Sequence, residues 1–171
     1  MKDISKYVDK TLSIFLMILM GAMVLTVTWQ VITRFILPNP SSFTEELAQF
    51  QLVWIGVLGA SYALRKKAHL GIDIIMHKVS LAGTKVIHVI VHICIILFAF
   101  FIMIIGGVRL VSLTFILKQI SASMGIPMGY IYMVIPISGL LMIYYSILAI
   151  QEIRRPDFMV DSVEIHKGGD V

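Results

Sequence analysis

Long runs without charge dominate this sequence and constrain its fold class more than any other feature. Four segments of 18 to 33 residues lack Asp, Glu, Lys and Arg: Thr11–Thr33, Leu47–Leu64, Val86–Val108 and Gln119–Gln151. A helix needs about 20 apolar residues to cross a bilayer. In lipid, an isolated segment can satisfy its backbone polar groups only as a helix, so these runs predict membrane-spanning helices.

We therefore predict an all-α integral membrane protein with four transmembrane helices, over about 11–36, 44–64, 85–108 and 127–150, with short interfacial helical segments. Residues 1–155 would form one membrane domain, and 156–171 a polar cytoplasmic tail. The first run exceeds the 7–15 apolar residues of a typical signal peptide, so we expect a retained helix. Composition agrees, because 14% of the residues are charged against roughly 25% in soluble proteins.

The distribution of Lys and Arg predicts the orientation. With the N-terminus in the cytoplasm, the inner segments hold 11 of the 14 basic residues and the outer segments hold Arg34, Arg109 and Lys118. Because cytoplasmic segments are enriched in Lys and Arg, both termini are predicted to be cytoplasmic. The basic residues flank apolar runs and form no stripe with interleaved aromatic residues, so we expect no nucleic-acid partner.

The outer connection between the first two helices carries charges of both signs. Ser42 and Glu45 fit a capping box, S-x-x-E, which would start the second helix. Arg34 would end the first helix, and Glu45 and Glu46 would begin the second, as the helix dipoles favour. Arg34 could bridge to Glu45 or Glu46, or the charges could act independently in water. The sequence leaves both readings open.

The inner connection after the second helix is apolar between its charges, as in a segment lying in the membrane interface. Its basic cluster would face anionic lipid. His69 and Asp73, four residues apart, are either a functional pair or two groups solvated among lipid headgroups. The residues assigned to this inner interface are Arg65, Lys66, Lys67, His69 and Asp73.

Small residues mark two helix faces on which close packing is expected. They are Gly56, Gly59 and Ala60 in the second helix, and Gly106 and Gly107 near the end of the third. Small residues let helices in membranes approach closely. The contact could lie within this bundle or against another chain.

Two features concern the length of the predicted third helix and the shape of the fourth. Apolar residues at helical spacing continue through 109–123, so either the third helix extends outward or a short helix lies on the surface. Pro136 removes a backbone donor inside the fourth helix and predicts a kink.

The sequence offers few candidates for catalytic or metal-binding residues. The centres of the four runs hold no ionisable Asp, Glu, Lys or Arg, which a membrane enzyme or proton-driven antiporter would need. His88 and His92 share a helix face; they could bind zinc or haem, or simply hydrogen-bond to another helix. We expect no enzyme, no metal and no cofactor in this chain. A membrane electron carrier and a stand-alone structural or assembly protein remain as alternatives.

Two groups of residues, in order and spacing, resemble the small membrane subunit of TRAP transporters, the DctQ-like family. The first group is Arg34-Phe35, Phe43-Thr44-Glu45-Glu46-Leu47-Ala48, Trp54, Gly59-Ala60, Arg65, His69 and Asp73. The second, similar to the fourth helix of that family, is Gly125-Ile126-Pro127, Tyr130, Pro136 and Leu141-Met142. Gly71 departs from the pattern, since the family often has a β-branched or apolar residue there.

The resemblance implies a subunit of a tripartite, Na⁺-driven transporter in the bacterial inner membrane. A periplasmic binding protein would deliver an organic acid to a large membrane subunit, which is expected to hold the sodium sites. This chain would be a fixed scaffold, its glycine faces contacting the large subunit and Arg34, Glu45 and Glu46 lying near the docked binding protein. The sequence is most similar to sialic-acid members, with C4-dicarboxylate members second.

Overall fold

The computed structural model describes residues 2–36, 41–66 and 81–153. Seven helical segments occur in these ranges: α1 (Lys2–Ile36), α2 (Ser42–Arg65), α4 (Leu81–Phe98), η1 (Ala99–Gly106), α5 (Gly107–Ile116), α6 (Met128–Tyr132) and α7 (Val134–Ile153). Four stretches are long and apolar enough to cross a membrane: Ser5–Ile36, Ser42–Arg65, Lys85–Ile116 and Met128–Ile153. The predicted class, an all-α membrane protein with four spans, is confirmed.

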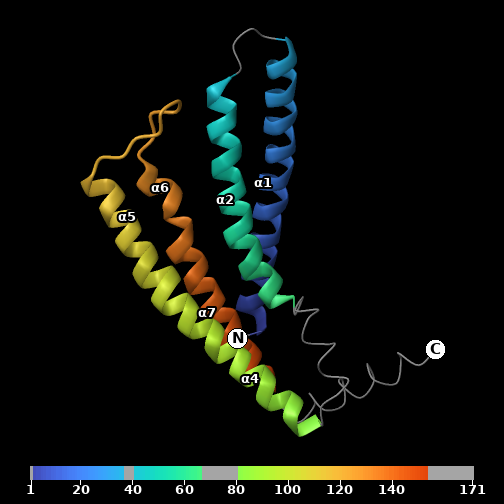
Figure 1. The fold of residues 1–171 in the computed structure, drawn as a ribbon. Coiled ribbons are helices and arrows are strands. Elements are labelled where there is room, and N and C mark those ends of the chain that lie inside the picture. The colour runs from blue at the N-terminus through green and yellow to red at the C-terminus, as the bar shows by residue number, and fades with distance from the viewer. Residues whose placement is uncertain (1, 37–40, 67–80, 154–171) are drawn as a thin grey trace, which may run out of the picture.

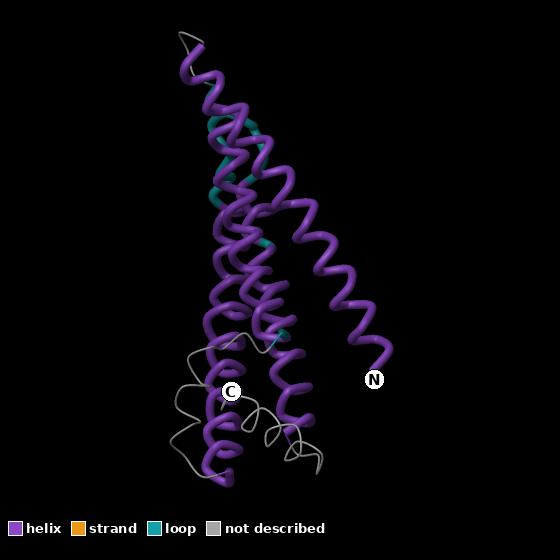
Figure 2. The backbone as a smooth tube through the Cα atoms, turned by 90° about the vertical axis from the view of Figure 1, so that its right-hand side faces the viewer, coloured by secondary structure: helices purple, strands orange, loops and turns teal. Residues whose placement is uncertain are grey.

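The helices form two antiparallel pairs (Figure 1). One pair is α1 with α2, and the other is the continuous rod α4–η1–α5 with α6 and α7. Helix α7 joins them, because it contacts α2 and also packs against α4 and η1. The two pairs converge toward the end of the molecule that holds the N-terminus (Figure 1). Figure 2 shows that α1 crosses the other helices obliquely.

The third span answers the question that the sequence left open about 109–123. Helix α4 passes without interruption through the π-helical segment η1 into α5, which ends at Ile116. The rod therefore extends the third span by two turns beyond the predicted boundary at residue 108. A turn over 117–127 follows, with Lys118 and Gly125 in the left-handed region at φ 49° and 66°.

Close packing between the rod and α7 depends on glycine. A Cβ added at Gly139 would lie 2.9 Å from Cβ of Met103, and one added at Gly107 would lie 3.0 Å from Cδ of Pro136. Gly107 therefore forms a contact between helices of this chain. Gly139 makes an equally close contact that the sequence analysis did not single out.

The predicted disturbance at Pro136 is a break in the last span. Helix α6 ends at Tyr132 and α7 starts at Val134. Pro136 has no N–H to donate to the carbonyl of Tyr132, four residues earlier, so one bond of the helical ladder is missing, and the ladder resumes with Ile137 N–H donating to the carbonyl of Met133 at 3.4 Å. The bond from Met133 N–H to the Gly129 carbonyl, 3.2 Å long, ends the short helix.

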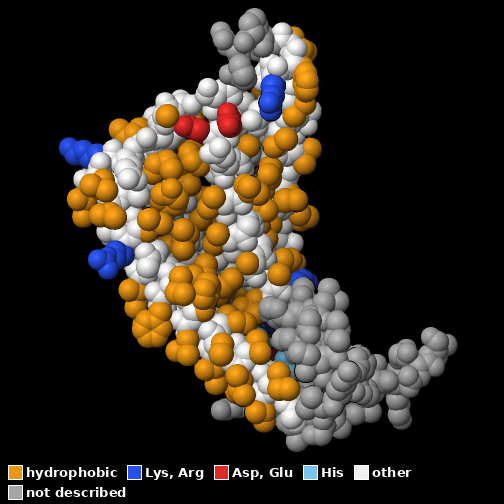
Figure 3. Space-filling view, in the orientation of Figure 1, with side chains coloured by type: hydrophobic (Ala, Val, Ile, Leu, Met, Phe, Trp, Pro, Cys, Tyr) orange, Lys and Arg blue, Asp and Glu red, His pale blue; other side chains and the backbone are white. Residues whose placement is uncertain are grey.

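The surface is apolar over most of its area. Figure 3 shows hydrophobic side chains across the visible face, with charged groups few and scattered. Large side chains such as Phe35, Leu25 and Ile116 are more than 70% exposed. The small buried core consists of Leu12, Leu58, Leu64, Val134 and Tyr145. A surface of this kind requires lipid or a protein partner around it.

Candidate functional site

Polar contacts follow α2 along its whole length, where it meets the other elements. We call this set the polar seam: Glu46, Trp54, Ser61 and Arg65 with their hydrogen-bond and ion-pair partners. The seam binds the two helix pairs together at the start of α2, in its middle and at its end; we call the start the outer end and the last part the inner end, after the predicted orientation.

At the outer end, Glu46 is bonded to the turn between α5 and α6. Its carboxylate accepts hydrogen bonds from the hydroxyl of Ser121 and from the backbone N–H groups of Ser123 and Met124, at 3.1 and 3.2 Å. The turn has its own backbone bonds, including Gly125 N–H to the Ser121 carbonyl at 3.1 Å. One carboxylate therefore fixes the turn against the start of α2.

The structure contradicts the predicted capping box at this end and decides between the two alternatives for Arg34. Helix α2 begins at Ser42, and Ser41 is its N-cap residue, without a side-chain cap bond. The predicted capping box between Ser42 and Glu45 is therefore not formed. Among residues 2–36, 41–66 and 81–153, the ion pairs are those of Arg65, so Arg34 bridges neither Glu45 nor Glu46. Arg34 and Glu45 are both exposed on this outer face.

In the middle of the seam, side chains of α2 bond to α6 and α7. The indole Nε1 of Trp54 donates to the carbonyl of Ile131 at 3.1 Å. The hydroxyl groups of Ser61 and Ser138 are 2.6 Å apart, and Ser138 also donates to the carbonyl of Val57 at 2.7 Å. Hydrogen bonds between helices in an apolar medium contribute about 0.6 kcal/mol on average.

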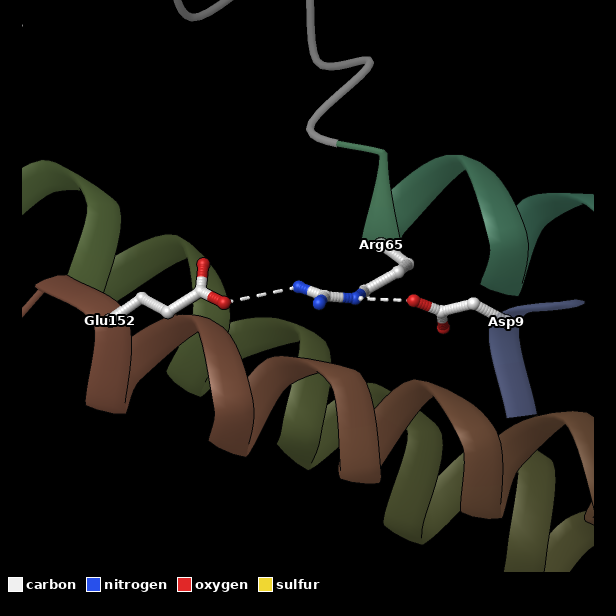
Figure 4. A network of polar contacts seen from close by, with 3 residues as sticks. All are labelled: Asp9, Arg65 and Glu152. Atoms are coloured by element: carbon white, nitrogen blue, oxygen red, sulfur yellow. Dashed lines mark hydrogen bonds and ion pairs between the residues drawn. The ribbon is translucent and has the colours of Figure 1, made fainter. Parts of the chain in front are cut away.

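At the inner end, Arg65 joins three helices (Figure 4). Its Nε lies 3.1 Å from Oδ2 of Asp9 in α1, and its Nη1 lies 3.2 Å from Oε1 of Glu152 in α7. The arginine side chain is 22% exposed. The interpretation of Arg65 as part of a lipid-facing basic cluster is thus corrected, because its guanidinium faces two carboxylates of this chain.

Of the remaining residues assigned to the inner interface, the structure describes Lys66. Lys66 lies with its Nζ 5.6 Å from the centre of the Tyr62 ring, a cation–π contact. Lys67, His69 and Asp73 lie outside the described residues, as does the predicted tail over 156–171. The pairing of His69 with Asp73 therefore stays a prediction.

Within residues 2–36, 41–66 and 81–153, no side chain or backbone packs closely on the glycine face of α2. A Cβ added at Gly56 or Gly59 would meet nothing within 4 Å, and Gly56 and Ala60 are exposed. At Gly106 the nearest atom is the carbonyl of Phe101 in the same rod, 3.8 Å away. Among the described residues, Gly107 is thus the one predicted contact residue that packs closely on another helix.

The two histidines on the face of α4 differ in exposure. His92 is buried and His88 is half-buried. Within the described ranges no group of three or more His, Cys, Asp or Glu side chains could hold a metal ion. The zinc alternative therefore finds no third ligand in that part of the chain.

Sequence reasoning missed Asp9, Ser121, Ser138 and Glu152 as members of the seam. Asp9 and Glu152 flank charge-free runs at the same predicted membrane level as Arg65. Opposite charges at one level of the membrane could have indicated these ion pairs. The serines gave no such signal, because nothing local distinguishes them from the other hydroxyl residues of these helices.

Comparison with known proteins gives matches over most of the chain. Residues 23–155 match the family described as tripartite ATP-independent periplasmic transporters, DctQ component. A putative TRAP transporter small permease protein of Haemophilus influenzae is 28% identical over 136 residues, which are 80% of this chain and 81% of that protein. The sialic acid TRAP transporter small permease protein SiaQ of Vibrio cholerae is 30% identical over 78 residues, which are 46% and 45% of the two chains.

A third relative is much longer. The sialic acid TRAP transporter permease protein SiaT of Haemophilus influenzae is 30% identical over 124 residues, which are 70% of this chain but 19% of that protein. The family match covers most of the chain and all four spans at least in part. The chain is therefore a transporter component and not an enzyme, a multi-pass membrane protein that belongs to the DctQ family of small permease subunits of TRAP transporters.

Proposed function

We propose that this chain is the stationary scaffold subunit of a Na⁺-coupled TRAP transporter in the bacterial inner membrane. It would brace a large membrane subunit during uptake of an organic acid that a periplasmic binding protein delivers. The observation that carries this proposal is the polar seam, which joins both helix pairs at three levels. A brace for a moving neighbour has to resist displacement, and such cross-links provide that resistance.

The distribution of charge supports a bracing role. Within the described spans, the acidic and basic residues lie toward the ends of the helices, and Arg65 is neutralised by two carboxylates. A permeation path for ions or acids needs charged groups near the middle of the membrane, and the polar side chains of the seam at that level are bonded to one another and to backbone carbonyls. Transport chemistry is therefore assigned to the partner, where we also place the sodium sites.

The longer relative supports a large membrane subunit as that partner. In SiaT, a segment similar to most of this chain is part of one much longer permease. Two parts joined in one polypeptide of one transporter work at the same place in the membrane. We infer that the partner of this chain corresponds to the remaining part of that permease.

The contact surface is proposed to include Gly56, Gly59 and Ala60 of α2. This face is open in the isolated chain, and small residues permit the close helix approach that drives association in lipid. Arg34 and Glu45, exposed on the outer face, are proposed to lie near the docked binding protein. Arg34→Glu should slow uptake and leave the amount of assembled membrane complex unchanged, and an unchanged uptake rate would remove Arg34 from this role.

The substrate is proposed to be a sialic acid such as N-acetylneuraminate, with a C4-dicarboxylate second. Two of the relatives are named for sialic acid transport. Since the binding protein selects the solute, a binding assay with the purified binding protein decides between these acids.

Reconstitution tests the proposal as a whole. Liposomes that contain this chain with the large subunit, the binding protein and an inward Na⁺ gradient should accumulate the acid. Liposomes with this chain alone should not, and neither should those with the large subunit alone. Accumulation by this chain without companions would overturn the scaffold assignment.

A further inference from the structure

An apolar groove of about 430 Å³ opens between the first half of α1, α2 and α7. Phe15 of α1, Trp54 of α2, and Ile137 and Leu141 of α7 are among its lining residues. The hydroxyl groups in this lining are those of Tyr7 and Thr11, both on α1. The groove lies inside the membrane-spanning parts of three helices, so lipid tails surround its opening.

The length of the groove matches one leaflet of a bilayer. Its wall on α1 runs from Tyr7 to Phe15, a rise of about 12 Å at 1.5 Å per residue. Half the hydrocarbon core is about 15 Å thick. The groove therefore extends from the level of the lipid headgroups, beside the N-terminal end of α1, toward the middle of the membrane.

The end of the groove near Tyr7 is basic. Lys6 and Lys10 are exposed and flank Tyr7 on α1, one helical turn apart. Asp9, the acidic residue between them, is already bonded to Arg65. Two ammonium groups are thus presented at the headgroup level, and charge complementarity favours an anionic group there.

We propose that this groove binds an acyl chain of an anionic phospholipid, whose phosphate lies at Lys6 and Lys10. The lipid would fill the space between α1 and α7 where they do not touch, and so couple the oblique helix α1 to the rest of the subunit. This inference does not depend on the scaffold proposal, because it concerns only the lipid that this chain binds.

Trp54 provides a direct probe of the groove. The chain has two tryptophans, so Trp29→Phe leaves Trp54 as the single fluorophore. The full-length variant would be reconstituted in phosphatidylcholine vesicles with increasing fractions of brominated phosphatidylglycerol or brominated phosphatidylcholine. Quenching should saturate at a low fraction of the brominated phosphatidylglycerol and rise in proportion to the brominated phosphatidylcholine. Equal, proportional quenching by both lipids would overturn the proposal.

Charge variants test the headgroup site. Replacing Lys6 and Lys10 by Gln should raise the phosphatidylglycerol fraction needed for half-maximal quenching by about tenfold or more, since basic residues near the membrane surface attract anionic headgroups. Lys118→Gln, on the turn at the opposite end of the molecule, should leave the curve unchanged. A curve that the double substitution does not move would show that the lysines do not hold the lipid.

A larger side chain placed in the groove distinguishes a bound lipid from a bound protein. Ile137 and Ile147 are both about 45% exposed on α7, but only Ile137 lines the groove. Native mass spectrometry of the complex with the large subunit should show a retained phosphatidylglycerol that Ile137→Phe removes and Ile147→Phe keeps. If the complex carries no lipid sensitive to Ile137→Phe, the groove is a protein contact and the proposal fails.

Discussion

The hydroxyl groups of Ser61 and Ser138 lie 2.6 Å apart, and neither side chain is exposed. They come from α2 and α7, and each also bonds to a backbone carbonyl, so the contact ties two helices by side chains and main chain together. Hydroxyl pairs of this kind are specific, because they form in only one register of the two helices.

Ser138→Ala should lower the stability of the chain by about 1 kcal/mol, since it removes the bonds to Ser61 and to the Val57 carbonyl. Thermal unfolding of the purified protein in detergent measures the effect. Ser112→Ala, at an exposed position of α5, serves as the control and should leave the unfolding temperature unchanged. Equal unfolding temperatures for the two variants would show that the serine pair contributes nothing measurable.

Arg65→Met should destabilise the chain more strongly, by about 1–3 kcal/mol, because it leaves two carboxylates without their charged donor. The same unfolding measurement applies. Adding Asp9→Asn and Glu152→Gln to Arg65→Met should recover part of the loss, since the unpaired charges are then gone. Lys66→Met is the neighbouring control at an exposed position. A loss as large in Lys66→Met would assign the effect to charge in general and not to this network.

Glu46→Ala should loosen the turn between α5 and α6, because the N–H groups of Ser123 and Met124 lose their acceptor. Hydrogen exchange in peptides that cover 121–126 should accelerate by about tenfold, because local opening of the turn becomes easier without this acceptor. Glu45→Ala, at the adjacent exposed position, should leave exchange in the turn unchanged. Unaltered exchange in Glu46→Ala would mean that the turn holds its shape by backbone bonds alone.

Gly59→Leu should abolish co-purification with the large subunit and leave the folding of this chain intact, because a Cβ added at this position meets no described atom within 4 Å. Affinity purification through a tag on this chain measures the partner that is retained. Gly21→Leu is a matched control, since its added Cβ on α1 is equally free. Normal recovery of the large subunit with Gly59→Leu would exclude this face of α2 from the interface.

The spans were predictable because each depends on its own segment. A run of apolar residues in lipid has to be helical regardless of its neighbours, so four spans and the end of α1 at Ile36 follow from local sequence. The fate of 109–123 was not local. Phe115 packs on Tyr130 of α6, with ring centroids 5.2 Å apart, and this contact lies on the part of the rod that the sequence left undecided.

The contacts of the polar seam were harder to predict from the sequence for the same reason, because they are not local. Glu46 was recognised as a residue of the outer face, but its partners lie 75 or more positions away in a turn. The capping box failed because Ser41 takes the N-cap position, one residue before the predicted Ser42, which puts Thr44 and not Glu45 at the third helical position. Gly56 and Gly59 were identified as small-residue positions, yet pattern alone could not tell an open face from a packed one.

The oblique course of α1 ties the subunit to the thickness of its membrane. Its 35 residues measure about 52 Å at 1.5 Å per residue, well beyond a hydrocarbon core of about 30 Å. Arg65 anchors one end of this helix through Asp9, so α1 cannot freely change its slope when the bilayer thins or thickens. Hydrophobic mismatch would then strain the ion-paired end first, and the lipid composition of the host membrane becomes part of what holds the subunit in shape.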